Sequence, residues 1–512
     1  MALAKVNSCG ISGIDGYIIE VEADLVQGLP GIDIVGLADT MVKESKERIK
    51  SAIKNSSLAL PQKKIIINLA PANTKKTGIS LDLAICMSIL AASGQISEDA
   101  CKGYIMLGEL ALDGTIRSAG GVLPAAVAAR DKGYTRLLVP EVNAKEAAVV
   151  EGIEVYGARS LSQAVKHFTG EERIEVSRTD AHQYFEESRY YSVDMSDVKG
   201  QESAKRALEV CAAGGHNLLM IGSPGSGKTM LAKRLPTILP DMSFEEALEV
   251  TKIYSVAGKL TGDMPIITAR PFRSPHHTAS GVALTGGGTN PRPGEISLAH
   301  RGVLFLDEFP EFRKDAIDAM RQPIEEGCVT VSRVSGSWVF PSSVMLVAGM
   351  NPCKCGYYGD ETRECTCSAG QIHSYLSKIS GPMLDRFDLH IEVPSIRYEE
   401  LEDKKKGETS EQIRERVNNA RQIQLERYKD YGIFCNSQLT PSLMDKFCSL
   451  TDDAREVMKL AFDSLGLSAR AHDRILKVAR TIADLDSKEN IGSEHLAEAI
   501  QYRSMDKKFW FN

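Results

Sequence analysis

The chain has 512 residues, of which 43% are hydrophobic, 25% charged and only 6% aromatic, and this composition excludes disordered and fibrous proteins. Its net charge of -7 and isoelectric point of about 5.9 provide no overall basic field, so any contact with nucleic acid must come from a local surface or a pore. No apolar run reaches the roughly 18 residues of a membrane span, and the start lacks the features of a secretion signal. We therefore expect a cytoplasmic protein with no membrane partner.

Residues 1–170 alternate β-rich runs with helical patterns and predict one α/β domain. The runs KIIINLAP, TRLLVP and IEVYG are typical of strands, and SLDLAICMSILAAS and VLPAAVAARDKG are typical of helices. Residues 171–195 follow with dense charge and no clear period, as in a surface linker. We expect the first domain boundary here.

Residues 196–395 predict a second α/β domain built on a parallel sheet with helices on both sides. The strand HNLLMI, a glycine loop and a helix come first, followed by the strand GVLFLDEF, the hairpin CVTVSRVSGSWVF and the strand SVMLVAGM. Residues 396–512 then turn helical and predict an α-bundle. The predicted fold class is α/β and multidomain, with a C-terminal helical domain.

A phosphate-binding loop is predicted where a strand meets a helix, because the segment 222–229 matches G-x-x-x-x-G-K-[ST]. Its backbone N–H groups would curl around phosphate oxygens, while the lysine reaches the β- and γ-phosphates of ATP and the threonine holds Mg²⁺. The predicted residues are Gly222, Ser223, Pro224, Gly225, Ser226, Gly227, Lys228 and Thr229.

Polar residues at the ends of the next two strands complete this predicted site. Asp307 and Glu308 follow the apolar strand VLFL, so that Asp307 would hold Mg²⁺ and Glu308 would polarise the attacking water. Asn351 ends a further strand and would donate to a γ-phosphate oxygen or orient water, although a turn-forming role fits it equally well on chemistry alone. The expected activity is ATP hydrolysis with Mg²⁺ as cofactor.

The order of the motifs resembles the Mg-chelatase-like AAA+ ATPases of the YifB/ComM group. The resemblance covers nearly the whole chain and rests on DVKGQ, GSPGSGKT, RPFRSPHHTAS, PRPGEISLAHRGVLFLDEFPEF, MNPCKCGYYGD, SGPMLDRFDLHIEVP and LSARAHDRILKVARTIADL. It implies an AAA+ P-loop core with a helix-2 insertion and a C-terminal helical lid. It also implies that Asn351 is sensor 1 and that Arg386 is an arginine finger reaching a neighbour's γ-phosphate. Arg470 resembles sensor 2, with Arg474 as the competing choice and a solvated helix residue as the alternative for either.

An arginine supplied by a neighbour requires a ring, so the resemblance implies a homo-hexamer. It further implies a DNA motor, a branch-migration helicase for single-stranded and branched DNA in recombination and natural transformation. Residues 278–300 would be the insertion, with the glycines 286–288 in a pore loop, unless this is an ordinary surface loop. Arg333 and Trp338 beside the hairpin turn are DNA-contact candidates, although Trp338 packing under the hairpin is an alternative. A chelatase-type ATPase that remodels a protein partner is the alternative function.

Residues 65–168 resemble the Lon-type protease domain, which uses a Ser-Lys dyad. Ser80 falls near the serine position, but Leu123 stands after a Gly-Gly pair where the lysine is expected. Without that lysine Ser80 has no activating base. We therefore expect a non-proteolytic domain that builds a ring or faces DNA, and this argues against an ATP-dependent protease.

Cys353, Cys355, Cys365 and Cys367 form two Cys-x-Cys pairs separated by nine residues. Four thiolates at this spacing are able to wrap one structural Zn²⁺, with a plain exposed loop as the alternative. An iron–sulfur cluster is remote, and a reducing compartment disfavours disulfides. His276 and His277 are adjacent, and since neighbouring side chains in an extended loop point apart, we expect a structural role rather than a metal site.

Overall fold

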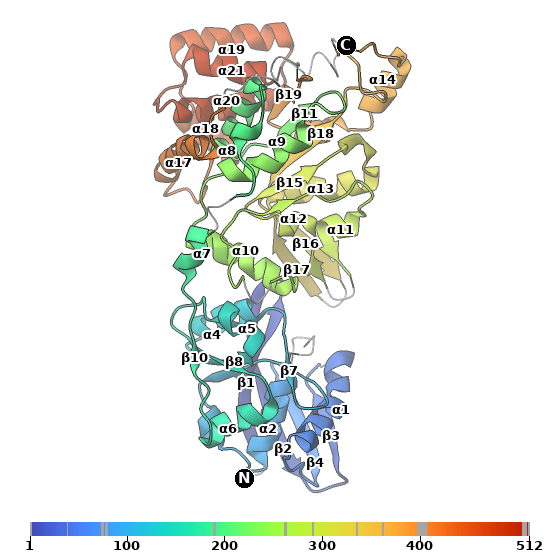
Figure 1. The fold of residues 1–512 in the computed structure, drawn as a ribbon, viewed down its shortest axis with the longest axis vertical. Coiled ribbons are helices and arrows are strands. Elements are labelled where there is room, and N and C mark those ends of the chain that lie inside the picture. Colours follow the sequence, from blue (N-terminus) through green and yellow to red (C-terminus); the bar gives the residue numbers. More distant parts are fainter. Residues whose placement is uncertain are drawn as a thin grey trace.

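The computed structural model describes residues 3–37, 39–72, 76, 80–187, 191–260, 264–288, 291–333, 336–360, 363–396, 407–503 and 509. Figure 1 shows an elongated molecule with the N-terminal domain at one end. The P-loop domain lies next to it, and the C-terminal helices lie beside the P-loop domain at the far end. The chain is α/β and multidomain, as the sequence predicts.

The N-terminal domain is built on a mixed sheet of eight strands in the order β10-β9-β8-β5-β1-β2-β4-β3. These strands are β1 (Leu3–Ser12), β2 (Asp15–Val26), β3 (Gly31–Val35), β4 (Lys64–Ala70), β5 (Tyr104–Met106), β8 (Arg136–Pro140), β9 (Glu154–Ala158) and β10 (Val176–Ser177). A small hairpin adds β6 (Glu109–Leu110) and β7 (Ile116–Arg117). The three runs predicted as strands are confirmed in β4, β8 and β9.

Helices cover this sheet, and the two that the sequence predicts are confirmed. Every residue of α2 is buried, which explains why its sequence is apolar on all sides. The helices are α1 (Thr40–Asn55), α2 (Asp82–Ala92), α3 (Glu98–Cys101), α4 (Val122–Asp131), α5 (Glu141–Ala147) and α6 (Leu161–Thr169).

The segment expected to be a linker has regular structure of its own. β10 pairs antiparallel with β9 and so extends the first sheet, and α7 (Ala181–Glu187) follows it. Thr268 of the P-loop domain donates to the carbonyl oxygen of Tyr184 in α7 at 2.9 Å. The segment therefore packs along both domains.

The P-loop domain has a five-stranded, fully parallel sheet in the order β12-β15-β18-β11-β19. Alternate residues of β11 join different hydrophobic clusters, since Leu218 and Met220 lie in one and Leu219 and Ile221 in the other, so both faces are covered. The strands are β11 (Leu218–Ile221), β12 (Phe272–Arg273), β15 (Val303–Leu306), β18 (Met345–Met350) and β19 (Leu389–Glu392). β12 and β19 were not predicted from the sequence.

Helices and two excursions surround this sheet. The helices are α8 (Glu202–Gly214), α9 (Lys228–Arg234), α10 (Phe244–Val256), α13 (Lys314–Glu326), α14 (Ala369–Leu376) and α15 (Gly381–Leu384), with short 3₁₀ turns η1 (Met195–Asp197), η2 (Leu235–Ile238) and η3 (Phe309–Glu311). The first excursion is α11 (Gly281–Thr285), β13 (Gly286–Gly287), β14 (Arg292–Pro293) and α12 (Glu295–Leu298), and the second is the predicted hairpin of β16 (Cys328–Arg333) and β17 (Gly336–Pro341).

The C-terminal region is helical, as predicted, and it shares one hydrophobic core with the P-loop domain. Its elements are α17 (Ser410–Arg427), η4 (Asn436–Gln438), α18 (Pro441–Phe447), α19 (Asp452–Leu465), α20 (Ala469–Leu485) and α21 (Ser493–Gln501). Buried Asp484 accepts from Arg427 at 2.6 Å and from Arg480 at 3.1 Å, which ties α17 to α20. Both helices pack against α8 of the P-loop domain.

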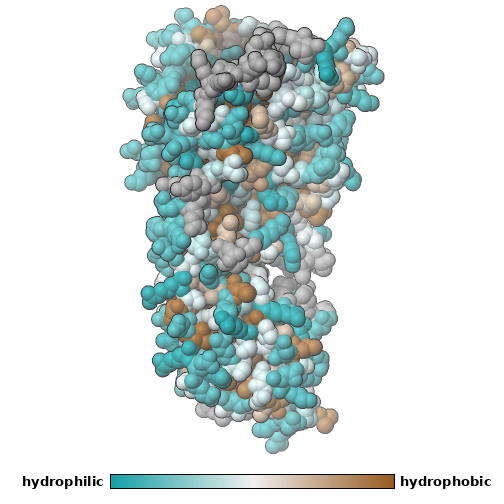
Figure 2. All heavy atoms as spheres, viewed as in Figure 1, coloured by the Kyte–Doolittle hydropathy of each residue, from teal (hydrophilic) through white to brown (hydrophobic). Residues whose placement is uncertain are grey.

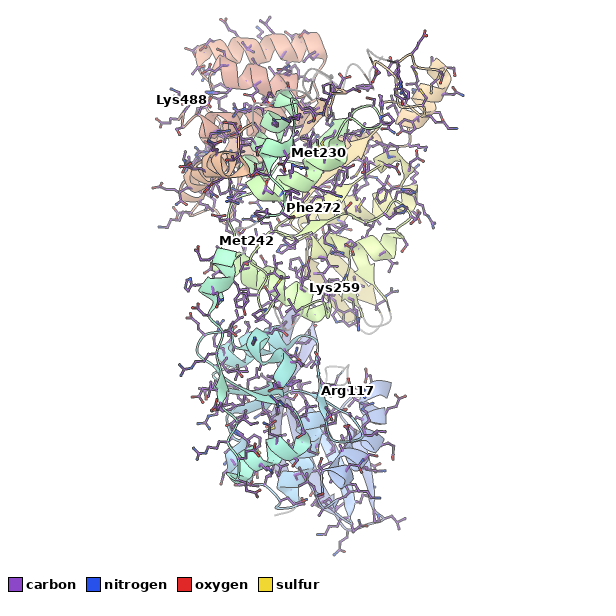
Figure 3. All side chains as sticks on the ribbon, in the orientation of Figure 1. Arg117, Met230, Met242, Lys259, Phe272 and Lys488 are labelled. Carbon is purple, nitrogen blue, oxygen red and sulfur yellow. The ribbon has the colours of Figure 1, made fainter. Side chains whose placement is uncertain are left out.

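The N-terminal domain meets the P-loop domain mainly through α10. Figure 3 labels Met242 and Lys259 just before and just after this helix, which crosses the end of the N-terminal domain. Met242, Ala247 and Val250 belong to a hydrophobic cluster whose other members come largely from α4, β8 and their neighbours. The two domains are therefore joined by a continuous apolar core.

Among the described residues no helix is both long and apolar enough to cross a membrane. The face seen in Figure 2 is covered mostly by hydrophilic residues, with apolar residues in small separate groups.

Candidate active site

The predicted phosphate loop lies between β11 and α9, as the motif requires. Gly225 and Gly227 have φ of +81° and +94°, in the left-handed region that glycine adopts without strain. A Cβ at Gly222 would collide with the carbonyl oxygen of Val393 and the hydroxyl of Ser226. The loop therefore needs glycine at these positions to turn its backbone tightly ahead of the helix.

Lys228 is held inside this loop rather than extended into solvent. Its Nζ donates to the carbonyl oxygens of Gly222 at 2.8 Å and Ser223 at 3.0 Å, and its side chain is buried. Burial lowers the pKa of Lys228, which means that its charge is poorly solvated. A buried ammonium ion above a curled backbone fits a phosphate group, so the residues present match the predicted ligand.

Side chains from the neighbouring strands meet at the same edge of the sheet. The hydroxyl of Thr229 donates to Asp307 Oδ2 at 2.6 Å, so the two predicted Mg²⁺ ligands already touch. Asn351 Oδ1 lies 3.4 Å from Lys228 Nζ. Glu308 follows with φ of +52°, a strained conformation for a non-glycine residue. The donor set of hydroxyl and carboxylate oxygens suits Mg²⁺.

Gln201, the last residue of the motif DVKGQ, hydrogen-bonds to the phosphate loop, a role that was not predicted from the sequence. Its Nε2 donates to the carbonyl oxygens of Ser226 at 2.6 Å and Pro394 at 3.2 Å. Its Oε1 is buried and accepts no hydrogen bond from the described residues. A left-handed residue directly before a helix, with φ of +58°, gives no recognisable pattern in sequence.

The expectation that His276 and His277 point apart is wrong. Their ring centroids lie 4.1 Å apart with an interplanar angle of 33°. The backbone N–H of Ala279 donates to the carbonyl oxygen of His276 at 2.9 Å, so this segment is a turn and not an extended strand. His277 Nδ1 lies 3.1 Å from Glu308 Oε2, which adds a histidine to the surroundings of the predicted base.

Arg386, Arg470 and Arg474 lie together, away from the phosphate loop, in the wall of one cavity of about 500 Å³. Asn217, the residue before β11, also lines this cavity, and its Nδ2 donates to the carbonyl oxygen of Arg386 at 2.8 Å. The phosphate loop follows the other end of β11. The three arginines and Lys228 are therefore found at opposite ends of β11.

Acidic residues hold these arginines in place. Arg386 pairs with Glu325, Arg470 lies 3.4 Å from Asp385, and Arg474 lies 3.6 Å from both Asp385 and Asp388. Although burial opposes it, His216 and Arg474 lower the pKa of Asp388 to about 2. Arg474 is 17% exposed and Arg470 is 70% exposed, so both sensor 2 candidates belong to this cluster but Arg474 is the better anchored.

Comparison with known proteins matches most of the chain to families of one magnesium chelatase subunit. Residues 194–401 match the family described as magnesium chelatase, subunit ChlI, residues 407–503 match its C-terminal part, and residues 21–143 match a further ChlI family. The chain is 43% identical over 511 residues to competence protein ComM of Haemophilus influenzae, covering 99% of this chain and 98% of that protein.

The chain belongs to the Mg-chelatase-like AAA+ family of YifB and ComM. It is 43% identical over 513 residues to YifB of Escherichia coli, covering 99% of this chain and 98% of that protein. It is also 26% identical over 171 residues to the archaeal Lon protease of Methanocaldococcus jannaschii, covering 32% of this chain and 26% of that protein. The resemblance seen in the motifs is thus confirmed.

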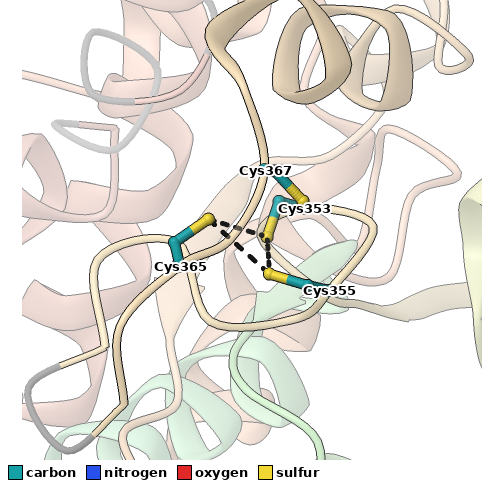
Figure 4. Close-up of side chains that lie close together, drawn as sticks. All are labelled: Cys353, Cys355, Cys365 and Cys367. Atoms are coloured by element: carbon teal, nitrogen blue, oxygen red, sulfur yellow. Dashed lines mark hydrogen bonds between the residues drawn. The ribbon is translucent and has the colours of Figure 1, made fainter.

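In this family member the four clustered cysteines form a compact group of free thiols (Figure 4). The Sγ atoms of Cys353, Cys355 and Cys365 lie 3.3 to 3.7 Å apart, and all four lie within 4.8 Å of one another. A tetrahedral zinc ion with Zn–S bonds of about 2.3 Å holds its sulfur ligands about 3.8 Å apart. The spacing and the four-thiol donor set therefore fit a metal ion.

The cysteine loop also touches the phosphate loop. A Cβ at Gly356, where φ is +90°, would lie 2.5 Å from Cδ of Pro224 and 3.9 Å from Cγ of Asn351. The backbone of the cysteine loop therefore packs directly on the loop that carries Lys228. This contact follows from the tertiary fold and was not predicted.

The two excursions of this AAA+ core lie next to each other. A Cβ at Gly287 of the insertion would lie 3.8 Å from Nη2 of Arg333 on the hairpin, and Arg333 is exposed. Trp338 is half-buried and packs against a cluster that contains Ile14, Val329 and Phe340. Part of the Trp338 side chain thus packs under the hairpin, whereas Arg333 faces solvent.

Leu123, which stands where the resemblance to the Lon-type domain would need the dyad lysine, is fully buried in the apolar core. The backbone N–H of Leu123 donates at 3.1 Å to Glu146, a buried carboxylate that also accepts from Asn143 at 3.0 Å and from Ser255 of α10. Asp82 is buried and pairs with Arg48 at 2.9 Å. The start of α4 is therefore part of the contact with the ATPase domain.

Proposed function

We propose that this chain hydrolyses ATP as one subunit of a homo-hexameric ring in the cytoplasm and uses the reaction to move DNA. The DNA reaction would be branch migration of single-stranded and branched DNA during recombination and natural transformation. The observation that carries the ATPase part is the meeting of Lys228, Thr229, Asp307 and Asn351 at one edge of the parallel sheet, with Glu308 beside them. The similarity to a protein named for competence supports the biological setting.

The residues of this edge divide the chemistry among them. Lys228 and the backbone N–H groups of the loop bind the β- and γ-phosphates of ATP, and Asn351 orients the γ-phosphate. Thr229 and Asp307 would hold Mg²⁺, which neutralises charge on the phosphate oxygens. Glu308 takes the proton of the attacking water as general base.

Catalysis needs a second subunit in this proposal, because one chain cannot bring both halves of the site together. Arg386 lies beside Asn217 at the amino end of β11, whereas Lys228 follows its carboxyl end. A guanidinium group on the γ-phosphate is worth about 10³ to 10⁵ in turnover. We assign that role to the neighbour's Arg386, with Arg474 or Arg470 beside it as sensor 2.

DNA contact is assigned to the insertion and the hairpin. Arg333 is exposed and adjoins Gly287, and Arg292 on β14 is exposed as well. These two excursions offer cations close to glycine residues although the chain carries a net charge of -7. Trp338 is half-buried against the cluster of Ile14, Val329 and Phe340, and base stacking on its accessible part belongs to the proposal.

Zinc would bind the four thiolates of Cys353, Cys355, Cys365 and Cys367 in a purely structural role. Such a site has no open position for substrate when all four ligands come from the protein. Its effect on ATP binding would run through the contact of Gly356 with Pro224.

The test is ATP-driven branch migration on labelled three- and four-stranded DNA junctions. Wild-type protein is expected to resolve them, whereas Glu308→Gln and Arg386→Ala fail and Arg455→Ala, an exposed arginine on α19, behaves as wild type. If ATP is hydrolysed while junctions stay intact and DNA leaves turnover unchanged, the DNA motor is wrong and the chelatase-type remodelling of a protein partner takes its place.

A mixing experiment tests the neighbour's arginine separately. Lys228→Ala and Arg386→Ala are each expected to be inactive alone. Mixed, they create interfaces in which an intact Lys228 faces an intact Arg386, so ATP turnover returns in part. A mixture as inactive as its components would contradict the shared site.

A further inference from the structure

A single asparagine joins the strand of the phosphate loop to the segment that carries the predicted arginine finger. Asn217 directly precedes β11, the strand whose other end leads into the phosphate loop. Its Nδ2 donates to the carbonyl oxygen of Arg386 at 2.8 Å, and its Oδ1 accepts from the backbone N–H of Leu346 on β18 at 2.7 Å. Because the donor end and the acceptor end of the amide are both used, the orientation of this side chain is fixed.

The main chain of Asn217 is held by the same segment. Its N–H donates to Oδ2 of Asp388 at 3.1 Å, and its carbonyl oxygen accepts from the N–H groups of Asp388 at 2.9 Å and Leu389 at 3.1 Å. These two residues follow Arg386 closely in the chain. Asn217 therefore binds both the carbonyl of Arg386 and the residues that come directly after it.

The carbonyl group of Arg386 needs a donor from outside its own helix. α15 ends at Leu384, and the N–H of Arg386 still donates to the carbonyl oxygen of Met383 at 3.0 Å. A carbonyl group at the end of a helix has no intrahelical N–H from which to accept a hydrogen bond. Asn217 supplies that donor, and it thereby ties the turn that carries Arg386 to the edge of the parallel sheet.

The guanidinium group of Arg386 keeps the capacity for a further ligand. Its Nη1 donates to the carbonyl oxygen of Pro382 at 2.6 Å, and its Nη2 pairs with the exposed carboxylate of Glu325. Its Nε is buried and has no acceptor among the described residues. The side chain is only 17% exposed, so its position follows that of its backbone. A misplacement of about 1 Å in a catalytic group costs about 100-fold in rate, so the anchoring of this backbone matters.

We propose that Asn217 is a positioning residue for Arg386 and therefore acts on the ATP of the neighbouring subunit rather than on the ATP of its own. This inference rests on the ring and the shared site of the proposed function. Asn217 touches no substrate, and its effect runs through the carbonyl of Arg386. The competing account is purely structural, with Asn217 joining β11 to β18 through Leu346.

Two variants of Asn217 separate these accounts. Asn217→Ala removes both side-chain contacts, whereas Asn217→Asp keeps the acceptor for Leu346 and loses the donor to Arg386. Both should lower ATP turnover by about 10- to 100-fold, with KM for ATP within about twofold of wild type because the phosphate loop is unchanged. Asn418→Ala is the matched control, since Asn418 Oδ1 likewise accepts from a backbone N–H, that of Asp241 at 3.2 Å, and it should keep wild-type turnover.

Mixed rings show in which subunit Asn217 acts. Lys228→Ala subunits present an intact Arg386, so mixing them with Asn217→Ala subunits should raise turnover above that of either variant alone. Asn217→Ala mixed with Arg386→Ala should show no such rise, because neither subunit presents a well-placed finger. The double variant of Asn217→Ala and Arg386→Ala should turn over ATP as slowly as Arg386→Ala alone, because both changes remove the same interaction.

The inference is overturned if Asn217→Asp keeps wild-type turnover. It is also overturned if Asn217→Ala mixed with Lys228→Ala stays inactive while Arg386→Ala mixed with Lys228→Ala recovers, because Asn217 would then act within its own subunit.

Failure of the proposed function is distinguishable, since it is seen in a mixture that contains no Asn217 variant. If Arg386→Ala and Lys228→Ala do not complement each other, the shared site is wrong. The double variant then still decides the role of Asn217. Turnover equal to that of Arg386→Ala supports positioning of Arg386 by Asn217, and a further loss contradicts it.

Discussion

Two helices of this chain, α4 and α9, each follow a glycine in the left-handed conformation, but different groups meet their N-termini. α4 of the N-terminal domain follows Gly121, with φ of +80°, and α9 of the P-loop domain follows Gly227, with φ of +94°. At α4 the first N–H groups are taken by the chain itself, since Leu123 donates to Glu146 and Gly121 donates to the carbonyl oxygen of Ser255 at 3.2 Å. At α9 no backbone N–H of the first turn donates to a carboxylate among the described residues; Asp307 accepts there from the side-chain hydroxyl of Thr229, and the buried cation Lys228 follows the glycine.

The two helices show that the N-terminus of a helix attracts negative charge, while the neighbouring residues determine whether an internal carboxylate or an external anion supplies it. Leu123 contributes only apolar surface, so the positive end of α4 is satisfied by an internal carboxylate and becomes a domain contact. Lys228 adds a charge that the loop carbonyls satisfy only in part, so the positive end of α9 stays suited to an external phosphate. The two glycine-initiated helices therefore differ in what meets the helix start, an internal carboxylate at α4 and a buried lysine at α9.

The largest effect is expected when the positive charge of Lys228 is removed from the start of α9. Lys228→Ala is expected to lower ATP turnover by at least about 100-fold, because a preorganised donor to developing phosphate charge is lost. Turnover of radiolabelled ATP measures this, with Lys233→Ala, an exposed lysine of the same helix, as the control. Near wild-type turnover of Lys228→Ala would mean that the start of α9 is not the nucleotide site.

The cysteine loop packs on the phosphate loop that precedes α9, and among the described residues α4 has no such cysteine cluster beside it. Protein grown with zinc is expected to carry one zinc ion per chain, measured by elemental analysis. Second-shell changes alone cost about 10- to 100-fold in metal affinity, so Cys353→Ser should weaken zinc binding by at least that much. Cys328→Ser, a cysteine of β16 outside the cluster, should keep the metal, and equal zinc contents would contradict the site.

Removing the Glu146 carboxylate from the start of α4 should lower the free energy of unfolding rather than the ATPase activity. Glu146→Ala leaves the N–H of Leu123, one N–H of the Asn143 amide and the hydroxyl of Ser255 without this acceptor, which costs about 1 to 3 kcal/mol for a buried group. Ser255→Ala removes a single donor and should cost about 1 kcal/mol. Urea denaturation of the full chain measures both losses of stability. A Glu146→Ala variant as stable as wild type would contradict a stabilising role of this carboxylate at the start of α4.

The smallest expected effect is on pH dependence. Burial raises the pKa of Glu146 above its usual value of 4.5. The native state therefore binds this proton more tightly than the unfolded state, and the contribution of Glu146 to stability falls as pH rises from 4.5 through the raised pKa. Glu146→Gln has no such proton, so its Tm relative to wild type should increase as the pH rises above 4.5. Glu151→Gln, at an exposed position, should run parallel to wild type.

Much of the nucleotide site could be predicted because its residues are close in sequence or follow strands. The loop at 222–229, Asp307 and Glu308 after β15 and Asn351 after β18 are each recognisable locally, and parallel strands bring their ends together. The assigned roles of Arg386, Arg470 and Arg474 remain predictions, and their location at the far end of β11 could not be foreseen from motifs alone.

Contacts between distant segments escaped prediction for a physical reason. Glu146 and Ser255 are 109 residues apart, and nothing in either local sequence marks a buried carboxylate or its donor. β19 has only four residues, too few to show a period, yet it completes the parallel sheet. His276 and His277 were assigned to an extended loop because a turn without Gly, Asn or Asp carries a weak signal.

The packing of Trp338 between the hairpin and Ile14 of the N-terminal domain gives the protein a natural optical reporter. The chain has only two tryptophans, and replacing Trp510 with Phe leaves Trp338 as the single indole. Its emission depends on how much water reaches the seam between the hairpin and the β1–β2 turn, where a Cβ at Gly13 would lie 2.8 Å from the carbonyl oxygen of Val339. The fluorescence of Trp338 would then report changes in the environment of the hairpin during nucleotide binding and release, without an added dye.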